Sequence, residues 1–276
     1  IMDVDGGNQV QLTDWPGYER ASDVSPDGTR LLVAHSPRGD WFFAPYNIWV
    51  MNIDGSDAKQ LTSCPKGEIR RWPVWTPDGK RIVYLLRRGF SRSSFSDNIW
   101  IMSQDGTNHQ ALTTGDARNV GHSVSPDGNQ IVFRPENDQG DDGIYIMTAD
   151  GEATRQVVEK DNPSSPLWHP NGMELCYQNV TKDDKYQIWK TNLKTGQSTL
   201  LVEEGEIFPV EYTPDGRMLI VSYYDGTSFN LGKIPTNGGE LVSIGKSDTW
   251  EGFNDFDPCF IDFGNFIQLV RKSQLM

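Results

Sequence analysis

The chain has 276 residues, of which 36% are hydrophobic and 11% aromatic, so it can bury a sizeable core within one folded unit. Its formal net charge of −13 argues against a nucleic-acid backbone or an anionic membrane as the main partner. No stretch approaches the roughly 18 apolar residues of a membrane span. The three cysteines, Cys64, Cys176 and Cys259, are too few and too scattered for a metal framework, and their disulfide state stays open.

The first recognisable element is the turn Ser25-Pro26-Asp27-Gly28, which recurs along the chain. Pro26 presets φ and Gly28 accepts a positive φ, so the pair favours a tight reversal. The copies begin at residues 25, 76, 125, 169 and 213, which gives a period of 44 to 51 residues. A degraded copy follows at 261–264. A period of this size predicts an array of repeats.

Each repeat contains four short segments that are rich in β-forming residues. In the first repeat these segments are Ala21–Val24, Arg30–Ala34, Asn47–Met51 and Lys59–Thr62. The second segment recurs at 81–84, 130–133, 174–177, 218–221 and 266–269, and the third recurs at 99–102, 144–147, 188–191 and 231–234. No segment of helical length keeps a period near 3.6. We therefore predict an all-β chain with four strands per repeat, which is the content of one propeller blade.

The two ends of the chain complement each other. Residues 1–13 match a third and a fourth strand, and residues around 253–271 match a first and a second strand. Joined, they complete one blade and close a ring, which leaves no exposed sheet edge at the seam. We predict a single domain over 1–276, a six-bladed β-propeller of four-stranded antiparallel blades. Deletion of residues 1–13 is expected to destabilise the ring strongly.

The recurring turn, the strand Ile99-Trp100-Ile101-Met102 and its equivalents, the Asp-Gly hairpins and the Leu-Thr endings resemble the WD40-like PD40 repeats of TolB-type propellers. The resemblance covers essentially the whole chain. Such repeats occur in periplasmic TolB, in propeller domains of serine peptidases and in some oligogalacturonate lyases. TolB also carries an N-terminal α/β domain, and we expect no counterpart of it within residues 1–276. The resemblance implies a periplasmic or secreted protein, with a cytoplasmic location as the alternative.

Propeller geometry separates the connections of each blade onto two faces. The turns between first and second strands, and between third and fourth strands, share one face, here called the uniform face because its turns are short and alike. The connections between second and third strands share the other face with the crossings between blades. Here these connections are long and unlike one another, so we call this the variable-loop face. Variable loops on a rigid scaffold usually carry the binding residues.

Two loops of the variable-loop face, 36–46 and 86–97, are rich in aromatic and basic residues. Rings and guanidinium groups around a channel mouth suit a sugar, a carboxylated ligand or a peptide tail. The competing interpretation is that the rings pack loops onto blades and the arginines pair with carboxylates. The predicted ligand- or partner-binding residues are Trp15, Tyr18, Glu19, Arg20, Trp41, Arg70, Arg71, Arg88, Arg118, His122, Glu206, Trp250, Glu251 and Asp255.

Catalytic patterns are sparse. The chain has no Gly-x-Ser-x-Gly elbow, and of its four histidines only His122 is expected near the channel mouth. The alternative to a binding module is an enzyme such as a lyase on uronate oligosaccharides. In it, His122 would act as the base and Arg70 or Arg71 would hold the substrate carboxylate. We predict a non-catalytic binding module, a monomer that takes a protein or an oligosaccharide at the channel mouth.

Metal ligands are also sparse. Lyases of related fold hold a metal with several histidines, and one histidine cannot do so. The acidic stretch 135–142 makes Asp138, Asp141 and Asp142 the candidate ligands of a calcium ion. We predict no resident metal or cofactor, with calcium as the alternative.

Overall fold

The computed structural model of the chain describes residues 10–37, 45–65, 67–91, 94–136, 143–160 and 162–246. These residues form β-strands joined by turns and loops. The described ranges contain no helix that is long and apolar enough to cross a membrane. The predicted all-β class is therefore confirmed.

The strands form five blades of four antiparallel strands each, with neighbouring strands paired in chain order. Blade 1 contains β1 (Tyr18–Val24), β2 (Arg30–Ser36), β3 (Asn47–Asn52) and β4 (Lys59–Gln60). Blade 2 contains β5 (Glu68–Trp75), β6 (Arg81–Ser91), β7 (Ser94–Ser103) and β8 (Gln110–Ala111). Blade 3 contains β9 (Arg118–Val124), β10 (Gln130–Glu136), β11 (Gly143–Thr148) and β12 (Thr154–Glu159). Blade 4 contains β13 (Pro163–Trp168), β14 (Glu174–Val180), β15 (Tyr186–Asn192) and β16 (Ser198–Glu204), and blade 5 contains β17 (Ile207–Tyr212), β18 (Met218–Tyr224), β19 (Phe229–Pro235) and β20 (Val242–Lys246).

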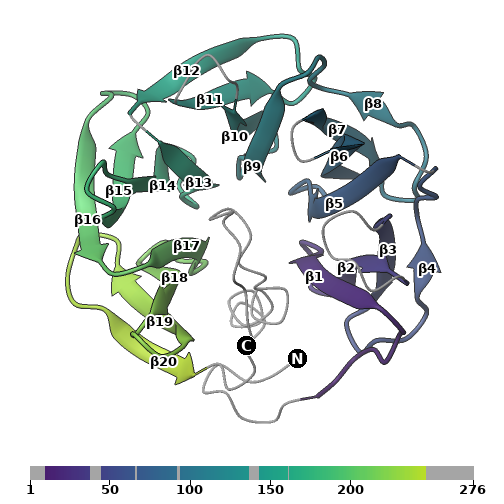
Figure 1. Cartoon of the computed structure of the whole chain (residues 1–276), viewed down its shortest axis with the longest axis horizontal. Helices are drawn as coiled ribbons and strands as arrows, with labels where there is room; N and C mark the ends of the chain where they lie inside the picture. The colour runs from purple at the N-terminus through teal and green to yellow at the C-terminus, as the bar shows by residue number, and fades with distance from the viewer. Residues whose placement is uncertain are drawn as a thin grey trace.

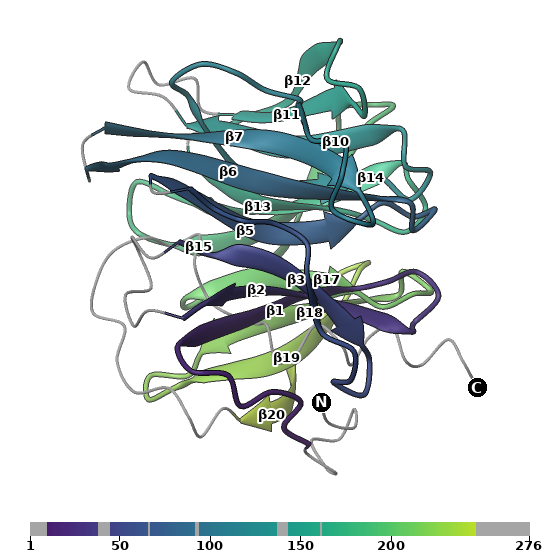
Figure 2. The same cartoon turned by 90° about the vertical axis from the view of Figure 1, so that its right-hand side faces the viewer.

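The five blades stand around a common axis, as in a propeller (Figure 1). The first strand of each blade lies nearest the axis and the fourth lies at the periphery. Side-on, the tips of β6 and β7 project at one side of the disc (Figure 2). Blades 2 and 3 are also joined by a parallel bridge between Asp97 and Arg118, so they form one eight-stranded sheet.

The repeated turn has the predicted geometry. The amide of Gly28 donates to the carbonyl of Ser25 at 2.8 Å, and Gly28 has a φ of 73°. The Ser25 hydroxyl donates to Oδ1 of Asp27 at 2.5 Å. This hydrogen bond and those from Thr29 lower the pKa of Asp27 to about 2, so the turn contains a carboxylate at neutral pH. The uniform face is thus built from copies of one self-contained turn.

Apolar side chains fill the spaces between blades. Leu32 of blade 1 and Ile82 of blade 2 are fully buried in one cluster, and Val83 and Ile131 join blade 2 to blade 3 in the next. Side chains of β6 alternate between these two clusters because successive residues of a strand point to opposite faces. The core is therefore a set of layers between blades, and blades 2, 3 and 4 are each covered on both faces.

Hairpin glycines also allow close backbone contact between blades 1 and 2 and between blades 2 and 3. Gly106 and Gly151 follow the third strands of blades 2 and 3 and have φ values of 86° and 82°. A Cβ on Gly106 would come within 2.5 Å of the carbonyl oxygen of Leu61, and one on Gly151 within 2.7 Å of that of Leu112. Only glycine allows the preceding blade to approach this closely.

Leu12 makes the same kind of close backbone contact with the hairpin glycine of blade 1, Gly55. A Cβ on Gly55, in the hairpin after β3, would lie 2.7 Å from the Leu12 carbonyl oxygen. Leu12 therefore occupies the place that Leu61 takes against the next blade, as expected if residues 10–13 end a fourth strand. The partner strands around 253–271 lie outside the described residues, as do residues 1–9. The sixth blade and its seam stay predictions.

The innermost strands of several blades contain bulges. In β5, β9 and β13 the register to the second strand shifts at Trp72, Gly121 and Ser165, which have φ values of 52°, 63° and 49°. A bulge adds one residue to the strand and re-aims the side chains around it. The residue after the bulge is Pro73 in β5 and His122 in β9.

One predicted connection differs from the structure. Residues 86–97 were expected to form a loop, but β6 continues to Ser91 and β7 begins at Ser94. The hairpin pairs Arg87 with Asp97 across the strands. Because oppositely charged residues face each other, the ladder extends where the apolar pattern has ended.

Candidate functional site

The crossings between blades and the connections between second and third strands meet on the variable-loop face. The amide of Cys64, in the crossing from blade 1, donates to Oδ1 of Asn47 at the start of β3, at 2.7 Å. The amide of Arg70 donates to the carbonyl of Tyr46 at 3.2 Å. The predicted grouping of these segments on one face is therefore observed for blades 1 and 2.

A buried ion-pair network lies on this face between blades 2 and 3. Arg87 donates through Nε and Nη2 to the two carboxylate oxygens of Asp97, at 2.9 and 2.7 Å. Nη2 of Arg71 lies 3.4 Å from Oδ2 of the same carboxylate. The side chains of Asp97 and Arg87 are 0% and 1% exposed. Asp97 is the centre of the network because its carboxylate accepts hydrogen bonds from arginines of two strands, Arg71 of β5 and Arg87 of β6.

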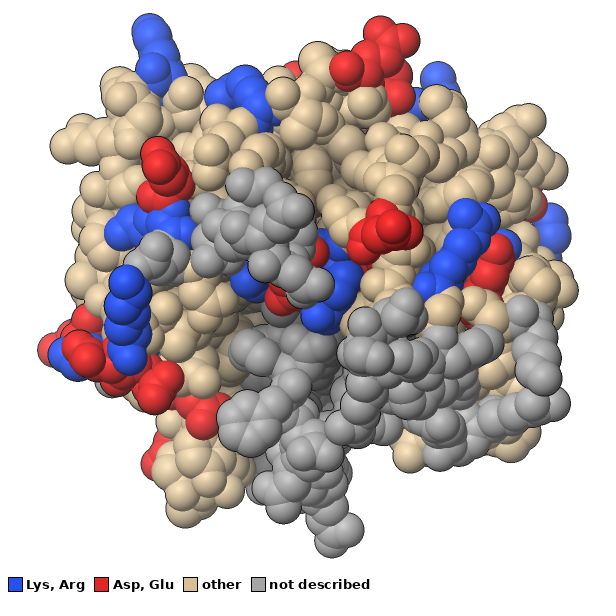
Figure 3. All heavy atoms as spheres, turned by 45° about the horizontal axis from the view of Figure 1, so that its top comes forward, with Lys and Arg blue, Asp and Glu red and all other residues tan. Residues whose placement is uncertain are grey.

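The network continues into blade 3. Arg118 forms an ion pair with Glu136 at 2.8 Å, and Nη1 of Arg134 lies 3.6 Å from the same carboxyl group. Nη2 of Arg134 donates to Oδ1 of Asn162 at 3.2 Å. We call Arg71, Arg87, Arg118 and Arg134, together with Asp97 and Glu136, the arginine cluster. Figure 3 shows basic and acidic side chains close together near the middle of the view.

Aromatic rings support the guanidinium groups of the arginine cluster. The Phe95 ring lies between Arg87 and Arg118, whose Cζ atoms are 3.8 and 4.4 Å from its centroid. The Cζ of Arg71 lies 4.3 Å from the Trp72 ring. Such stacking orients a guanidinium group and adds cation–π attraction. Stacking therefore restricts the orientations of Arg71, Arg87 and Arg118.

Two opposing effects set the ionisation of Asp97. Burial alone would raise its pKa, but the hydrogen bonds from Arg87 and the charges of Arg71 and Arg87 outweigh burial. The pKa of Asp97 consequently lies below its usual range. The carboxylate is ionised at neutral pH and the network is a set of charged partners.

His122 lies in β9, beside blade 2, and is 8% exposed. Burial lowers its pKa to about 4, and backbone groups at Trp72 and Val83 offset only part of this effect. Neither ring nitrogen makes a hydrogen bond of ordinary length and angle within the part of the chain that the structure describes, so the two backbone groups interact with the ring only weakly. The imidazole is therefore neutral at pH 7 and is a weaker base than an ordinary histidine.

Blades 4 and 5 carry a different surface on the same face. The rings of Tyr186, Phe208, Phe229 and Tyr224 follow one another across the two blades. Their centroids are 5.9 Å apart from Tyr186 to Phe208, 6.2 Å from Phe208 to Phe229 and 5.2 Å from Phe229 to Tyr224. We call these residues the aromatic row. Phe208 is 5% exposed and Tyr224 is 39% exposed, so the row leads from the interior to solvent.

Three predicted binding residues are accessible on the variable-loop face. Tyr18 is 43% exposed at the start of β1, and the side chain of Arg88 is 55% exposed on β6. Nε of Arg88 lies 3.1 Å from Oε1 of Glu68. Glu206 is exposed in the crossing before β17. Their role in binding stays a prediction.

Other predicted residues have structural contacts. The ring of Trp15 packs against His35 and Trp49, with centroids 5.1 and 5.0 Å away. Glu19 accepts a hydrogen bond from the Thr13 hydroxyl. The competing interpretation, in which aromatic and charged residues hold loops to blades, fits these two sites.

Arg70 and Arg71 do not converge on one site. Arg70 donates to the Cys64 sulfur at 3.0 Å and pairs with Glu68 at 2.9 Å, whereas Arg71 belongs to the arginine cluster on the other side of β5. Alternation along the strand separates adjacent side chains. The predicted pairing of either arginine with His122 stays a prediction.

Several candidate residues lie outside what the structure describes. They are the side chain of Arg20, the residues Trp41, Trp250, Glu251 and Asp255, and the proposed calcium ligands Asp138, Asp141 and Asp142. Among the residues that it does describe, no group of three or more His, Cys, Asp or Glu side chains could hold a metal ion.

Sequence reasoning did not select Asp97, Arg87, Arg134 or the aromatic row as a site. Arg87 belongs to the predicted loop 86–97. A usable signal was present, because a hairpin through 86–97 sets Arg87 directly opposite Asp97. The rings of the aromatic row come from β15, β17, β18 and β19, and no local pattern connects them.

The antiparallel blades around one axis define a β-propeller (Figure 1). The model of the TolB β-propeller domain family, PD40, matches residues 1–134 and 73–250. The chain therefore belongs to the PD40, or TolB-like, propeller family. TolB from Acinetobacter baumannii superposes with a TM-score of 0.65 at 19% identity, over 80% of this chain and 54% of that one.

Two relatives are similar in sequence. An uncharacterized protein of Agrobacterium fabrum is 25% identical over 218 residues, which are 77% of this chain and 70% of that protein. The uncharacterized peptidase YuxL of Bacillus subtilis is 26% identical over 197 residues, which are 71% of this chain but only 28% of the peptidase. The chain thus spans about a quarter of the peptidase and about half of TolB.

Proposed function

We propose that the protein is a non-catalytic binding module that docks a protein segment across the mouth of the channel on the variable-loop face. The observation that carries the proposal is that the arginine cluster and the aromatic row occupy the same face. Arginine, tyrosine, tryptophan and phenylalanine are the residue types enriched in protein interfaces. The partner that suits both surfaces combines acidic groups with apolar side chains.

The physical character of the two surfaces supports this proposal. The arginines are held by ion pairs and stacked rings, so little side-chain entropy is lost when a partner binds. The aromatic row offers a large apolar area with few rotatable bonds. A periplasmic or secreted location belongs to the same proposal and is supported by membership of the TolB-like family.

The test is a thermal-shift screen of acidic-apolar peptides and uronate oligosaccharides, because a ligand of the native state raises the melting temperature. The variants Arg118→Gln and Tyr224→Ala remove one partly exposed residue from each surface. Arg217→Gln and Met173→Ala are matched controls on the uniform face, where the side chain of Arg217 is 85% exposed and Met173 is 59% exposed.

A peptide should raise the melting temperature of the parent and of both controls. The shift should shrink in both Arg118→Gln and Tyr224→Ala. A shift that both variants retain, or that the control variants lose instead, would place binding elsewhere and contradict the proposal.

The alternative is elimination on acidic oligosaccharides with His122 as the base. Its lowered pKa, its burial and the separation of Arg70 from Arg71 count against this alternative. Elimination forms an unsaturated product that absorbs ultraviolet light. An absorbance rise with oligogalacturonate that disappears in His122→Ala would favour the enzyme.

A further inference from the structure

The side chain of Glu206 lies beside the aromatic row. Glu206 directly precedes β17, and the amide of Tyr224 donates to its carbonyl at 2.8 Å. This hydrogen bond continues the pairing of Ile207 with Tyr223 by one residue on each strand, so Glu206 stands opposite Tyr224. Opposed residues of an antiparallel pair project from the same face, with Cβ atoms about 5 Å apart. The carboxylate and the Tyr224 ring are therefore neighbours.

Glu206 also acts on the other end of the row. Burial raises the pKa of the Tyr186 hydroxyl, and the negative charges of Glu206 and Asp184 raise that pKa further. Phe208 projects from the same face as Glu206, because residues two apart on a strand point to the same side. Its ring centroid is 5.9 Å from that of Tyr186. One carboxylate thus serves three of the four rings.

Nothing within the described ranges neutralises this carboxylate. Glu206 is exposed and makes no ion pair with the residues that the structure describes. Glu203, three residues earlier on β16, differs from it because Nζ of Lys185 lies 3.1 Å from its Oε1. A cation from outside the chain is therefore the partner that Glu206 suits.

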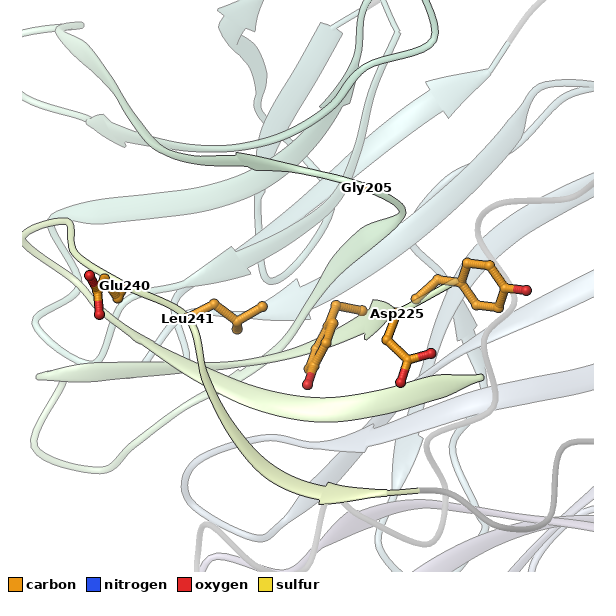
Figure 4. Close-up of a pocket in the computed structure, with 6 residues that line it drawn as sticks. Gly205, Asp225, Glu240 and Leu241 are labelled. Carbon is orange, nitrogen blue, oxygen red and sulfur yellow. The ribbon is translucent and has the colours of Figure 1, made fainter. Parts of the chain in front are cut away.

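Open space adjoins the pair of Glu206 and Tyr224. A pocket of about 550 Å³ is lined by Tyr224 and by the residues next to the pair in sequence, Gly205 and Asp225. These two lie towards one end of the pocket, and Glu240 lies at the other end (Figure 4). A side chain of a partner can therefore approach the pair.

The arginine cluster shows which group a ring and a carboxylate hold together in this fold. The Cζ of Arg87 lies 3.8 Å from the centroid of the Phe95 ring. The same guanidinium group donates to both carboxylate oxygens of Asp97, at 2.9 and 2.7 Å. A flat guanidinium group can stack on a ring and still direct its N–H groups at a carboxylate. The aromatic row and Glu206 supply the same two kinds of group on blades 4 and 5.

We propose that the aromatic row and Glu206 bind an arginine side chain of the docked segment. Its guanidinium group stacks on the Tyr224 ring and donates to the Glu206 carboxylate. This inference rests on the proposed function, because it names a residue of the segment that docks on the variable-loop face. It also gives the segment a direction, with acidic groups over blades 2 and 3 and the arginine over blades 4 and 5.

The first test compares two peptides by calorimetric titration of the full chain. Both consist of glutamate and leucine residues with capped ends, and the last residue is arginine in one and citrulline in the other. Citrulline has nearly the shape of arginine but no charge. The arginine peptide should bind about three- to tenfold more tightly, which is the range of one exposed cation–π contact together with one exposed ion pair.

The second test removes the carboxylate. Glu206→Gln should reduce the preference for the arginine peptide about two- to fivefold and leave the affinity for the citrulline peptide unchanged. Glu240→Gln is the matched control, because Glu240 is exposed between β19 and β20 on the uniform face of the same blade. It removes the same charge from the chain and should keep the full preference.

Equal affinity for the two peptides would overturn this inference and leave the proposed docking function standing. A preference that Glu206→Gln retains in full would do the same. Tighter binding of a peptide that ends in lysine would overturn the assignment to arginine. If neither peptide bound, the proposed function would fail, and this inference would fail with it.

Discussion

The variable-loop face is built in two different ways. Over blades 2 and 3 it rests on the arginine cluster, in which the buried carboxylate of Asp97 is bound by Arg87 and Arg71. Over blades 4 and 5 it rests on the aromatic row, whose member Phe208 is buried at the start of β17. The scaffold is the same four-stranded blade in both places.

The comparison shows that the same blade fold can be sensitive to changes of charge in one half of the ring and to changes of side-chain volume in the other half. Buried charges require a particular partner. A buried guanidinium group without its carboxylate has lost its hydration, and no ion pair compensates for that cost. Packed rings require volume and shape, which a similar apolar side chain can partly supply. We expect the charged half to be sensitive to isosteric changes of charge and the aromatic half to changes of volume.

The largest effect is expected for Asp97→Asn. The change keeps the shape of the side chain but leaves two buried guanidinium groups beside a neutral amide. The free energy of unfolding should fall by about 3–5 kcal/mol in urea denaturation, the usual cost of breaking a buried ion pair. Asp116→Asn, exposed in the crossing before β9, is the control and should stay close to the parent. A loss below about 1 kcal/mol would show that the network contributes little to stability.

The second effect is a pH dependence that comes from His122. Because its pKa falls from 6.5 in the unfolded chain to about 4 in the folded protein, the unfolded chain takes up the proton first as the pH falls. His122 therefore stabilises the fold fully above pH 6.5 and loses this contribution towards pH 4. The loss should approach about 3 kcal/mol.

This loss is measured as the difference in unfolding free energy between the parent and His122→Phe at several pH values. Carboxylates such as Asp97 titrate in both proteins, so their contribution to the pH dependence cancels in this difference. A difference that does not change with pH would mean that the imidazole titrates normally and is reached by water.

A smaller effect is expected in the aromatic half. Phe208→Leu keeps an apolar side chain at a buried position and loses the ring contacts with Tyr186 and Phe229. The expected cost is about 1 kcal/mol by chemical denaturation, typical of a near volume-conserving change. If this variant lost as much stability as Asp97→Asn, the two halves would not differ as described.

The smallest effect is expected for Arg88→Gln. This arginine pairs with Glu68 at 3.1 Å, but its side chain is 55% exposed, so water and salt screen the pair. Stability should change by less than about 1 kcal/mol. A double-mutant cycle with Glu68→Gln measures the pair directly, and a coupling energy near that of a buried pair would be inconsistent with this exposure.

Much of the architecture was predictable because it repeats. The turn at Ser25 and its copies contain their own hydrogen bonds, so four residues are enough to recognise each one. The second strand of blade 1 was predicted over Arg30–Ala34 and runs over Arg30–Ser36. Strand ends are harder to predict than turns, because the last residues are held by pairing partners rather than by their own pattern.

The site was only partly predictable, because its residues depend on register and on distant strands. Arg87 and Asp97 interrupt the apolar pattern, which made a strand extension look like a loop. Tyr18, Arg88 and Glu206 were correctly expected on the variable-loop face. Phe208 and Tyr224 both reach the ring of Phe229 only when β17 pairs with β18 and β18 pairs with β19, and no spacing along the chain predicts these contacts.

The hairpin glycines have a consequence for how such a ring can grow. The contact between Gly106 and Leu61 joins consecutive repeats, and blade 2 carries both a glycine, Gly106, for the blade before it and a leucine, Leu112, for the blade after it. A duplicate of such a repeat therefore brings both contact residues with it and can be inserted next to the original. Blade number can change during evolution without a new interface being invented, as in other repeat proteins.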